Sequence, residues 1–298
     1  MTYSAGGTIE ATDYNTRIAN INAIWGVGAG SNGYGQSTTL SNVTSTATVS
    51  ATNWASAIAR LDSIRNHQSG VTSGITQPTA GNTVQYLSAL DTQISTIITN
   101  KLSAATRGTA APTGVGGVAN ATAWSSSATK EITATWSSTD TVRYFFNAGG
   151  RLTWYYSVVS GTTTKATDWN TFLTNTVGTI TLGSNYCSRS GTGGDGLTQN
   201  TGVGYYNLTS TYQTLFIIGS TSATADYGLN YITIQAKLGA TANIVAVQAV
   251  LTDAAADTFN DTVNGTTRVD MGYTPPETTY LSNVWGAISG GTGTNTQS

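Results

Sequence analysis

Two segments near the start of the chain repeat one pattern of apolar positions, spaced i, i+4, i+7 and i+10. These positions are Tyr14, Ile18, Ile21 and Ile24 in the first segment and Trp54, Ile58, Leu61 and Ile64 in the second. The spacing places them on one face of an α-helix. Asp13 and Asn53 directly precede the two aromatic residues, and each is predicted to cap its helix. Residues 11–70 therefore indicate a duplicated cap–helix–loop unit.

A third helix is predicted from Thr83 to about Ile98, with Tyr86 and Leu90 on its apolar side. The connections over residues 26–50 and 68–82 are long and rich in Gly, Ser, Thr and Asn. Loops of that length are unusual in a compact helical domain. We therefore expect them to be extended arms that lie on neighbouring subunits.

The densest aromatic and β-branched run spans residues 142–156 and is interrupted by Asn147–Gly150. Two apolar arms around a Gly-containing loop predict a β-hairpin, and their nearly continuous apolar character places it at the centre of a sheet. A short helix is expected from a cap at Asp168 to about Asn175. Further strands are predicted at 132–136, 178–182, 203–208, 213–219, 228–238 and 243–252.

These elements predict a mainly β protein with N-terminal helices, an α+β fold. Residues 1–110 form a helical and extended region for docking and oligomerisation, 111–125 a linker, and 126–275 an antiparallel β-sandwich. Residues 276–298 are expected to hold a short helix over 280–288, followed by a mobile tail.

Composition narrows the functional classes. Only 9% of the residues are charged, against roughly 25% in ordinary soluble domains, while 39% are hydrophobic and the net charge is −2. No basic patch for nucleic acid and no apolar span for a membrane is present. Cys187 is the only cysteine, which excludes a disulfide or a cysteine zinc site within one chain. Residues 1–7 lack a secretory pattern, so we expect folding in a cytoplasm.

The sequence offers little catalytic chemistry. Residues 28–33 and 191–196 match Gly-x-Gly-x-x-Gly, but neither match follows a predicted strand and opens a helix, so no cofactor is predicted. The sole histidine, His67, lies at the end of the second helix, where a basic side chain is favoured, and no Gly-x-Ser-x-Gly motif accompanies it. We predict no catalytic residue, cofactor or metal and interpret the protein as a non-enzyme.

Two binding hypotheses stay open. Asp253, Asp257 and Asp261 could bind calcium, although their spacing differs from that of a calcium loop and favours a solvated loop. Aromatic side chains also stack on sugars. Candidate glycan contacts are Tyr205, Tyr206, Tyr212 and Tyr227, against the alternative that they pack in a core or interface.

Two stretches resemble virion structural proteins of tailed bacteriophages. One runs from Asp13-Tyr14-Asn15 to Gly33-Tyr34-Gly35-Gln36, and the other joins residues 142–151 to Ala166-Thr167-Asp168-Trp169-Asn170. The resemblance implies a virion component that is assembled in the host cytoplasm. Tail fibre, baseplate-associated protein, collar or neck appendage, and capsid decoration all stay open. The resemblance also implies a homo-oligomer, a trimer or a higher ring.

The functional prediction is a structural virion component that contacts itself and other virion proteins, without nucleic acid or membrane insertion. The predicted docking residues are Tyr14, Ile18, Ile21, Trp25, Trp54, Ile58 and Leu61. The predicted sandwich core includes Tyr144, Phe146, Leu152 and Trp154. The main alternative is a receptor-binding adhesin for a bacterial surface glycan, and a third is a depolymerase with paired carboxylates.

Overall fold

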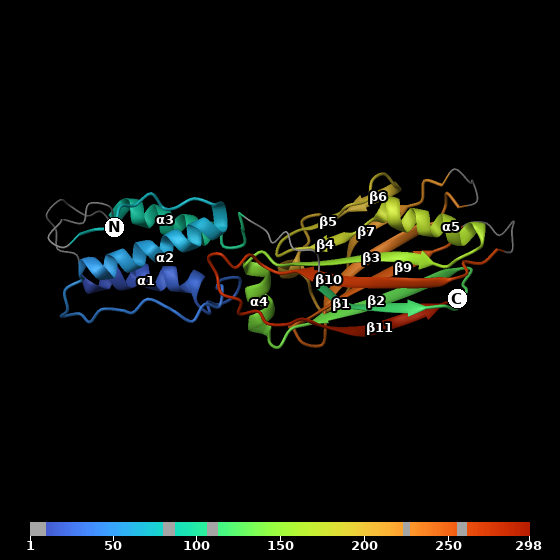
Figure 1. The fold of residues 1–298 in the computed structure, drawn as a ribbon. Coiled ribbons are helices and arrows are strands. Elements are labelled where there is room, and N and C mark those ends of the chain that lie inside the picture. Colours follow the sequence, from blue (N-terminus) through green and yellow to red (C-terminus); the bar gives the residue numbers. More distant parts are fainter. Residues whose placement is uncertain (1–9, 80–86, 106–112, 223–226, 255–260) are drawn as a thin grey trace. The chain divides into compact units, whose positions relative to one another are not determined.

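A computed structural model describes residues 10–79, 87–105, 113–222, 227–254 and 261–298 (Figure 1). The chain forms two compact units: a helical unit of residues 1–108, 143–149 and 276–285, and a sandwich unit of residues 109–142, 150–275 and 286–298. The helices and two antiparallel sheets confirm the predicted α+β class. The chain passes between the units five times, so neither unit is one continuous segment.

The helical unit is built on α1 (Ala11–Trp25), α2 (Ala51–Ser69) and α3 (Leu87–Thr99). The predicted apolar faces of α1 and α2 are confirmed, because all eight positions of the repeat are buried. Arg17 on α1 also forms an ion pair with Asp91 on α3 at 2.7 Å. Of the predicted third helix, residues 83–86 lie outside the described part of the chain.

The helix caps differ from the prediction by three residues. In α2 the cap is Ser50, whose Oγ accepts from the backbone N–H of Asn53 (3.2 Å), while Asn53 Oδ1 accepts from the N–H of Ser50 (2.9 Å). Asp13 likewise accepts from the N–H of Glu10 at the start of α1 (3.2 Å). The Asx residues therefore occupy the third helical position of a capping box, a role usually taken by Glu or Gln.

The connection after α1 folds back onto its own helix. The Asn22 side chain makes two hydrogen bonds to the backbone of Leu40, at 2.8 and 2.9 Å. Asn15 makes the same pair of bonds to Val43. In the connection after α2, Ser73 donates its backbone N–H to Asp62 of that helix (2.6 Å). The prediction that these connections are arms on other subunits is wrong for the segments held in this way.

Only the second arm of the predicted central hairpin is a strand. The first arm is helix α4 (Thr139–Asn147), whereas the second is β3 (Arg151–Val159). Ser138 begins the helix by accepting the N–H of Thr141 on its hydroxyl (3.1 Å). Residues 143–149 belong to the helical unit, where Asn147 donates to the carbonyl of Gly33 (2.8 Å). An apolar run this short fits a buried helix as well as a buried strand.

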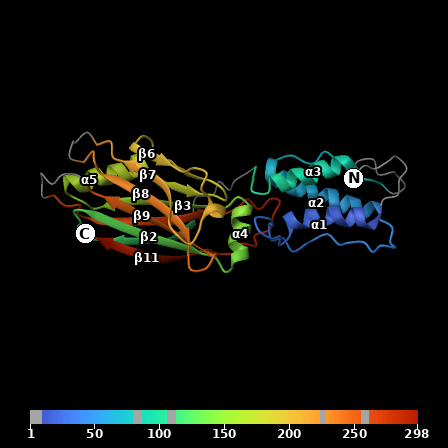
Figure 2. The ribbon, with the colours of Figure 1, turned by 180° about the vertical axis from the view of Figure 1, so that it is seen from behind.

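The sandwich unit has a five-stranded sheet in the order β1-β10-β3-β4-β5 and a six-stranded sheet in the order β11-β2-β9-β8-β7-β6 (Figures 1 and 2). The bounds in the first sheet are β1 Thr113–Asn120, β10 Thr266–Thr274, β4 Ile180–Leu182 and β5 Cys187–Arg189. Those in the second are β11 Ser289–Gln297, β2 Ser127–Thr135, β9 Ile244–Thr252, β8 Tyr231–Leu238, β7 Gln213–Gly219 and β6 Asp195–Gln199.

Several strand predictions are confirmed, including β7 and the long β8–β9 hairpin. In β2, buried and partly exposed residues alternate along the strand, as expected of a sheet with one face on a core. The strand predicted at 203–208 is instead a 3-10 turn over Tyr205–Asn207. The predicted short helix is α5 (Thr164–Thr171), continued by a π-helical turn over Phe172–Val177. The prediction of a cap at Asp168 is wrong, because Thr163 caps the helix and Asp168 lies inside it.

The ends of the sandwich also correct the prediction. The predicted linker 111–125 holds β1, and the predicted mobile tail holds β11, which pairs with β2. Residues 280–288 form no helix. β1 and β11 are edge strands of different sheets that lie against each other, and a side chain at Gly290 would collide with the carbonyl of Val115. Glycine therefore permits the close approach of the two edges.

Candidate functional site: a groove on the five-stranded sheet

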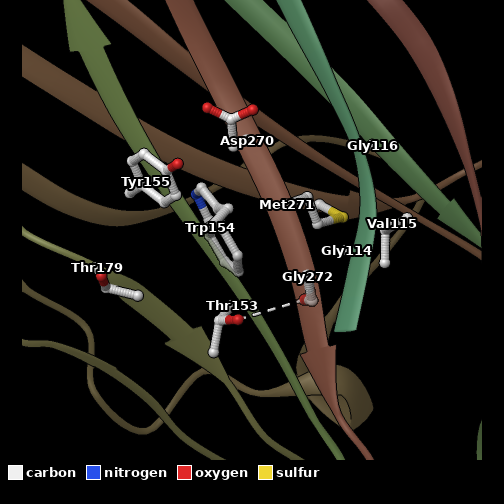
Figure 3. Close-up of a pocket in the computed structure, with 10 residues that line it drawn as sticks. All are labelled: Gly114, Val115, Gly116, Thr153, Trp154, Tyr155, Thr179, Asp270, Met271 and Gly272. Carbon is white, nitrogen blue, oxygen red and sulfur yellow. Dashed lines mark hydrogen bonds between the residues drawn. The ribbon is translucent and has the colours of Figure 1, made fainter. Parts of the chain in front are cut away.

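A shallow groove of about 600 Å³ crosses the five-stranded sheet (Figure 3). Its lining comes from β1, β10 and β3, with Thr179 just before β4. The lining residues are Gly114, Val115, Gly116, Thr153, Trp154, Tyr155, Thr179, Asp270, Met271 and Gly272. All of them belong to the sandwich unit.

Strand register brings the polar residues of the groove together. Asp270 on β10 lies opposite Tyr155 on β3, and Gly272 lies opposite Thr153. Because side chains alternate along a strand, these four positions share one face of the sheet, while Trp154 points to the core and is fully buried. The Thr153 hydroxyl donates to the carbonyl of Gly272 (3.4 Å) (Figure 3).

Glycines leave the floor of the groove open. Beside the groove, Gly117 on β1 lies opposite Asp270, whose Oδ1 takes the space that a Cβ atom at Gly117 would need (2.6 Å). Gly114 pairs with Gly272, so two facing positions on adjacent strands carry no side chain. A ligand could therefore approach the backbone closely beside the ring of Tyr155.

One aromatic and one carboxylate dominate the chemistry of the groove. Tyr155 is 46% exposed, which is high for a large apolar side chain. Its pKa is raised by partial burial and by the negative charge of Asp270. Asp270 forms an ion pair with Arg268, whose side chain is 40% exposed. The groove thus combines an open aromatic face, a carboxylate acceptor and threonine hydroxyls.

This arrangement suits binding more than catalysis. Aromatic faces pack on the C–H faces of sugars, while carboxylate and hydroxyl groups pair with sugar hydroxyls. Glycoside hydrolysis requires two carboxyl groups about 5–10 Å apart. Among the residues that line the groove, Asp270 is the only acidic one. The groove therefore gives no support to the depolymerase alternative.

The four tyrosines predicted to bind glycan do not form one surface. Tyr205 and Tyr206 pack edge to face, 5.1 Å apart, and the Tyr205 hydroxyl donates to Ala242, which follows β8. Tyr227 precedes β8 and donates to Asp261 (3.1 Å). Tyr212 lies under Lys237, with Nζ 4.1 Å from the ring centroid. Tyr205 and Tyr227 therefore lie near opposite ends of β8, and the four candidates do not form one aromatic cluster.

Of the three candidate calcium ligands, Asp253 has a buried side chain that is paired with a lysine, so the solvated loop favoured by the sequence is wrong at this position. Lys165 on α5 forms an ion pair with Asp253 and also donates to the backbone carbonyl of Asp261 (2.9 Å). Asp257 lies outside the described residues. Within the described part of the chain, no group of three metal-binding side chains occurs.

The seven predicted docking residues form the core of the helical unit. Six of them are at most 1% exposed and Trp25 is 7% exposed, with Tyr14 packed edge-on against Trp54 at 5.1 Å. The prediction that these side chains dock directly onto other proteins is therefore wrong, because they are buried inside their own unit. Leu152 and Trp154 lie in the sandwich core as predicted, whereas Tyr144 and Phe146 are buried in the helical unit.

His67 lies in the last turn of α2, as predicted, but its surroundings do not favour a charge. It is 3% exposed and packs against the Tyr34 ring at 5.1 Å. Burial lowers its pKa to about 4, with a smaller opposing effect from Glu277. The side chain is therefore neutral at pH 7. The glycines at 28, 30 and 33 have positive φ and shape the turn after α1, in agreement with a structural role.

Comparisons with protein-family models, with curated proteins and with solved structures found no match. Among the described residues, no helix is both long and apolar enough to cross a bilayer.

Proposed function

We propose that the protein is a non-enzymatic structural component of a bacteriophage virion, associated with the tail, the collar or neck, or a fibre. It assembles in the host cytoplasm as a trimer or a higher ring and docks onto other virion proteins. The main support for the proposal is that the chain forms two units with buried apolar cores although only 9% of its residues are charged. Low charge limits the repulsion that accumulates when many copies pack together.

The structure changes which residues we propose for docking. Among the described residues of the helical unit, the exposed large apolar side chains are Val27, Val71, Ile98 and Tyr280. These side chains are available to a neighbouring molecule, whereas the predicted seven are covered. The resemblance of residues 13–36 and 142–170 to tailed-phage proteins supports the same assignment.

The proposal is tested on particles of a phage that encodes this chain. Quantitative mass spectrometry of purified virions should find the protein at a fixed copy number, in a simple ratio to the ring-forming proteins. Purified particles that lack the protein would contradict the proposal.

The groove favours a second candidate function, recognition of a bacterial surface glycan by the same virion component. Tyr155→Ala should abolish the binding of host polysaccharide fragments in saturation-transfer NMR. Tyr231→Ala is the matched control, because Tyr231 is similarly exposed (37%) on the other sheet. Equal binding by both variants would reject the groove as the glycan site.

A further inference from the structure

Strand β11 lacks the side chains that usually hold an edge strand in place. Its sequence, Ser-Gly-Gly-Thr-Gly-Thr-Asn-Thr-Gln, contains no apolar side chain, and none of its nine residues is buried. Hydrophobic burial is the main force that fixes a strand on a core, and edge strands without it fray readily. β11 nevertheless completes the six-stranded sheet by pairing with β2.

One buried lysine faces this strand. Lys130 on β2 is fully buried, between the core residues Ala128 and Ile132 on the same face of the strand. Its neighbour in the pairing with β11 is Asn295, and Lys130 Nζ contacts Asn295 Oδ1. No carboxylate forms an ion pair with Lys130 in the described part of the chain. A buried ammonium without a counter-ion is costly, and this cost shifts the equilibrium of Lys130 toward the neutral amine.

We propose that Lys130 and Asn295 form an intramolecular amide bond that fastens β11 to β2. The neutral Lys130 amine attacks Cγ of Asn295, and a bond forms between Nζ and Cγ. The bond from Cγ to Nδ2 breaks, and Nδ2 leaves as ammonia with the proton that Nζ gives up. No electron is transferred and no further reactant is needed.

The state of the amine agrees with this chemistry. Burial lowers the pKa of Lys130 to about 8, so at neutral pH much more of the amine is in the nucleophilic form than in an exposed lysine. Lys165 provides the contrast within the same unit. It is similarly buried, but the carboxylate of Asp253 supplies a counter-ion. We therefore expect a covalent bond at Lys130 and an ordinary ion pair at Lys165.

The mass of the purified full-length protein tests the proposal without any variant. It should be lower than the mass of the unlinked chain by one ammonia. Trypsin cannot cleave after a lysine whose amine is bonded, so residues 108–143 should stay in one piece. This peptide should be released joined to residues 269–298. Wild-type protein at the full unlinked mass, with the two peptides separate, would overturn the proposal.

Two variants separate the bond from other losses of ammonia. Lys130→Arg keeps a cation but cannot form the amide, and Asn295→Ala removes the carbonyl carbon that is attacked. Both should have their full calculated masses. An ammonia loss that persists in Lys130→Arg would instead show cyclisation of an asparagine and would overturn the proposal. Each of these outcomes is independent of whether the protein is a virion component.

Discussion

Lys165 and Asp253 form an ion pair from which water is almost excluded, with side chains that are 2% and 1% exposed. Lys165 lies in the first turn of α5, and Asp253 directly follows β9. The pair joins a helix to the end of a strand, and Lys165 neutralises a carboxylate that was a candidate calcium ligand. The local charge is therefore balanced by the protein itself.

Breaking this pair should destabilise the sandwich unit. Lys165→Met leaves a buried carboxylate uncompensated, which typically costs about 3–5 kcal/mol. The control is Arg268→Met, which breaks an exposed ion pair worth at most about 1 kcal/mol. Urea unfolding measures both. Equal losses in the two variants would contradict the role assigned to burial.

His67 should make the helical unit less stable in mild acid. Its pKa of about 4 in the folded state lies below the roughly 6.5 of an unfolded chain. Below pH 6.5 the unfolded state therefore binds more protons, and stability falls as the pH drops from about 6.5 to 4. The loss from this group should approach roughly 3 kcal/mol, at about 1.4 kcal/mol per pKa unit.

Urea unfolding at a series of pH values measures this effect. His67→Gln removes the titrating group and should flatten the pH dependence in that window. A slope that is the same in wild type and variant would show that other groups cause it.

The contact between the two edge strands should depend on Gly290. Gly290→Ala introduces a methyl group against the carbonyl of Val115 and should cost about 1–3 kcal/mol. Gly114→Ala on β1 is the control, because a Cβ atom there meets nothing within 4 Å. It should change stability by no more than about 0.5 kcal/mol. Thermal unfolding of the two variants measures the difference, and equal effects would contradict the close packing.

Helical periodicity and the β8–β9 hairpin were predictable because each carries a long, regular pattern. The first arm of the supposed hairpin was not, since residues 142–146 are too few to show a period. The signal for a helix was the cap at Ser138, which lies outside the apolar run. β1 and β11 were not predicted because both are rich in glycine, which has low β-propensity, and only pairing with neighbouring strands fixes them.

The groove could not be read from the sequence. Asp270 and Tyr155 are more than a hundred positions apart and meet through strand register alone. Tyr155 stands in a run of aromatic residues in which nothing marks it as exposed while Trp154 and Tyr156 are buried. The burial of the docking candidates also depends on packing among three helices, which one helix pattern cannot reveal.

The native mass of the full-length protein, by size-exclusion chromatography with light scattering, tests the central claim most directly. The whole chain is required because neither unit is a continuous segment. We expect a trimer or a larger ring whose mass is unchanged between low and high salt, because few charges are available to hold it together. A protein that stays monomeric at the highest attainable concentration would contradict the proposed self-assembly.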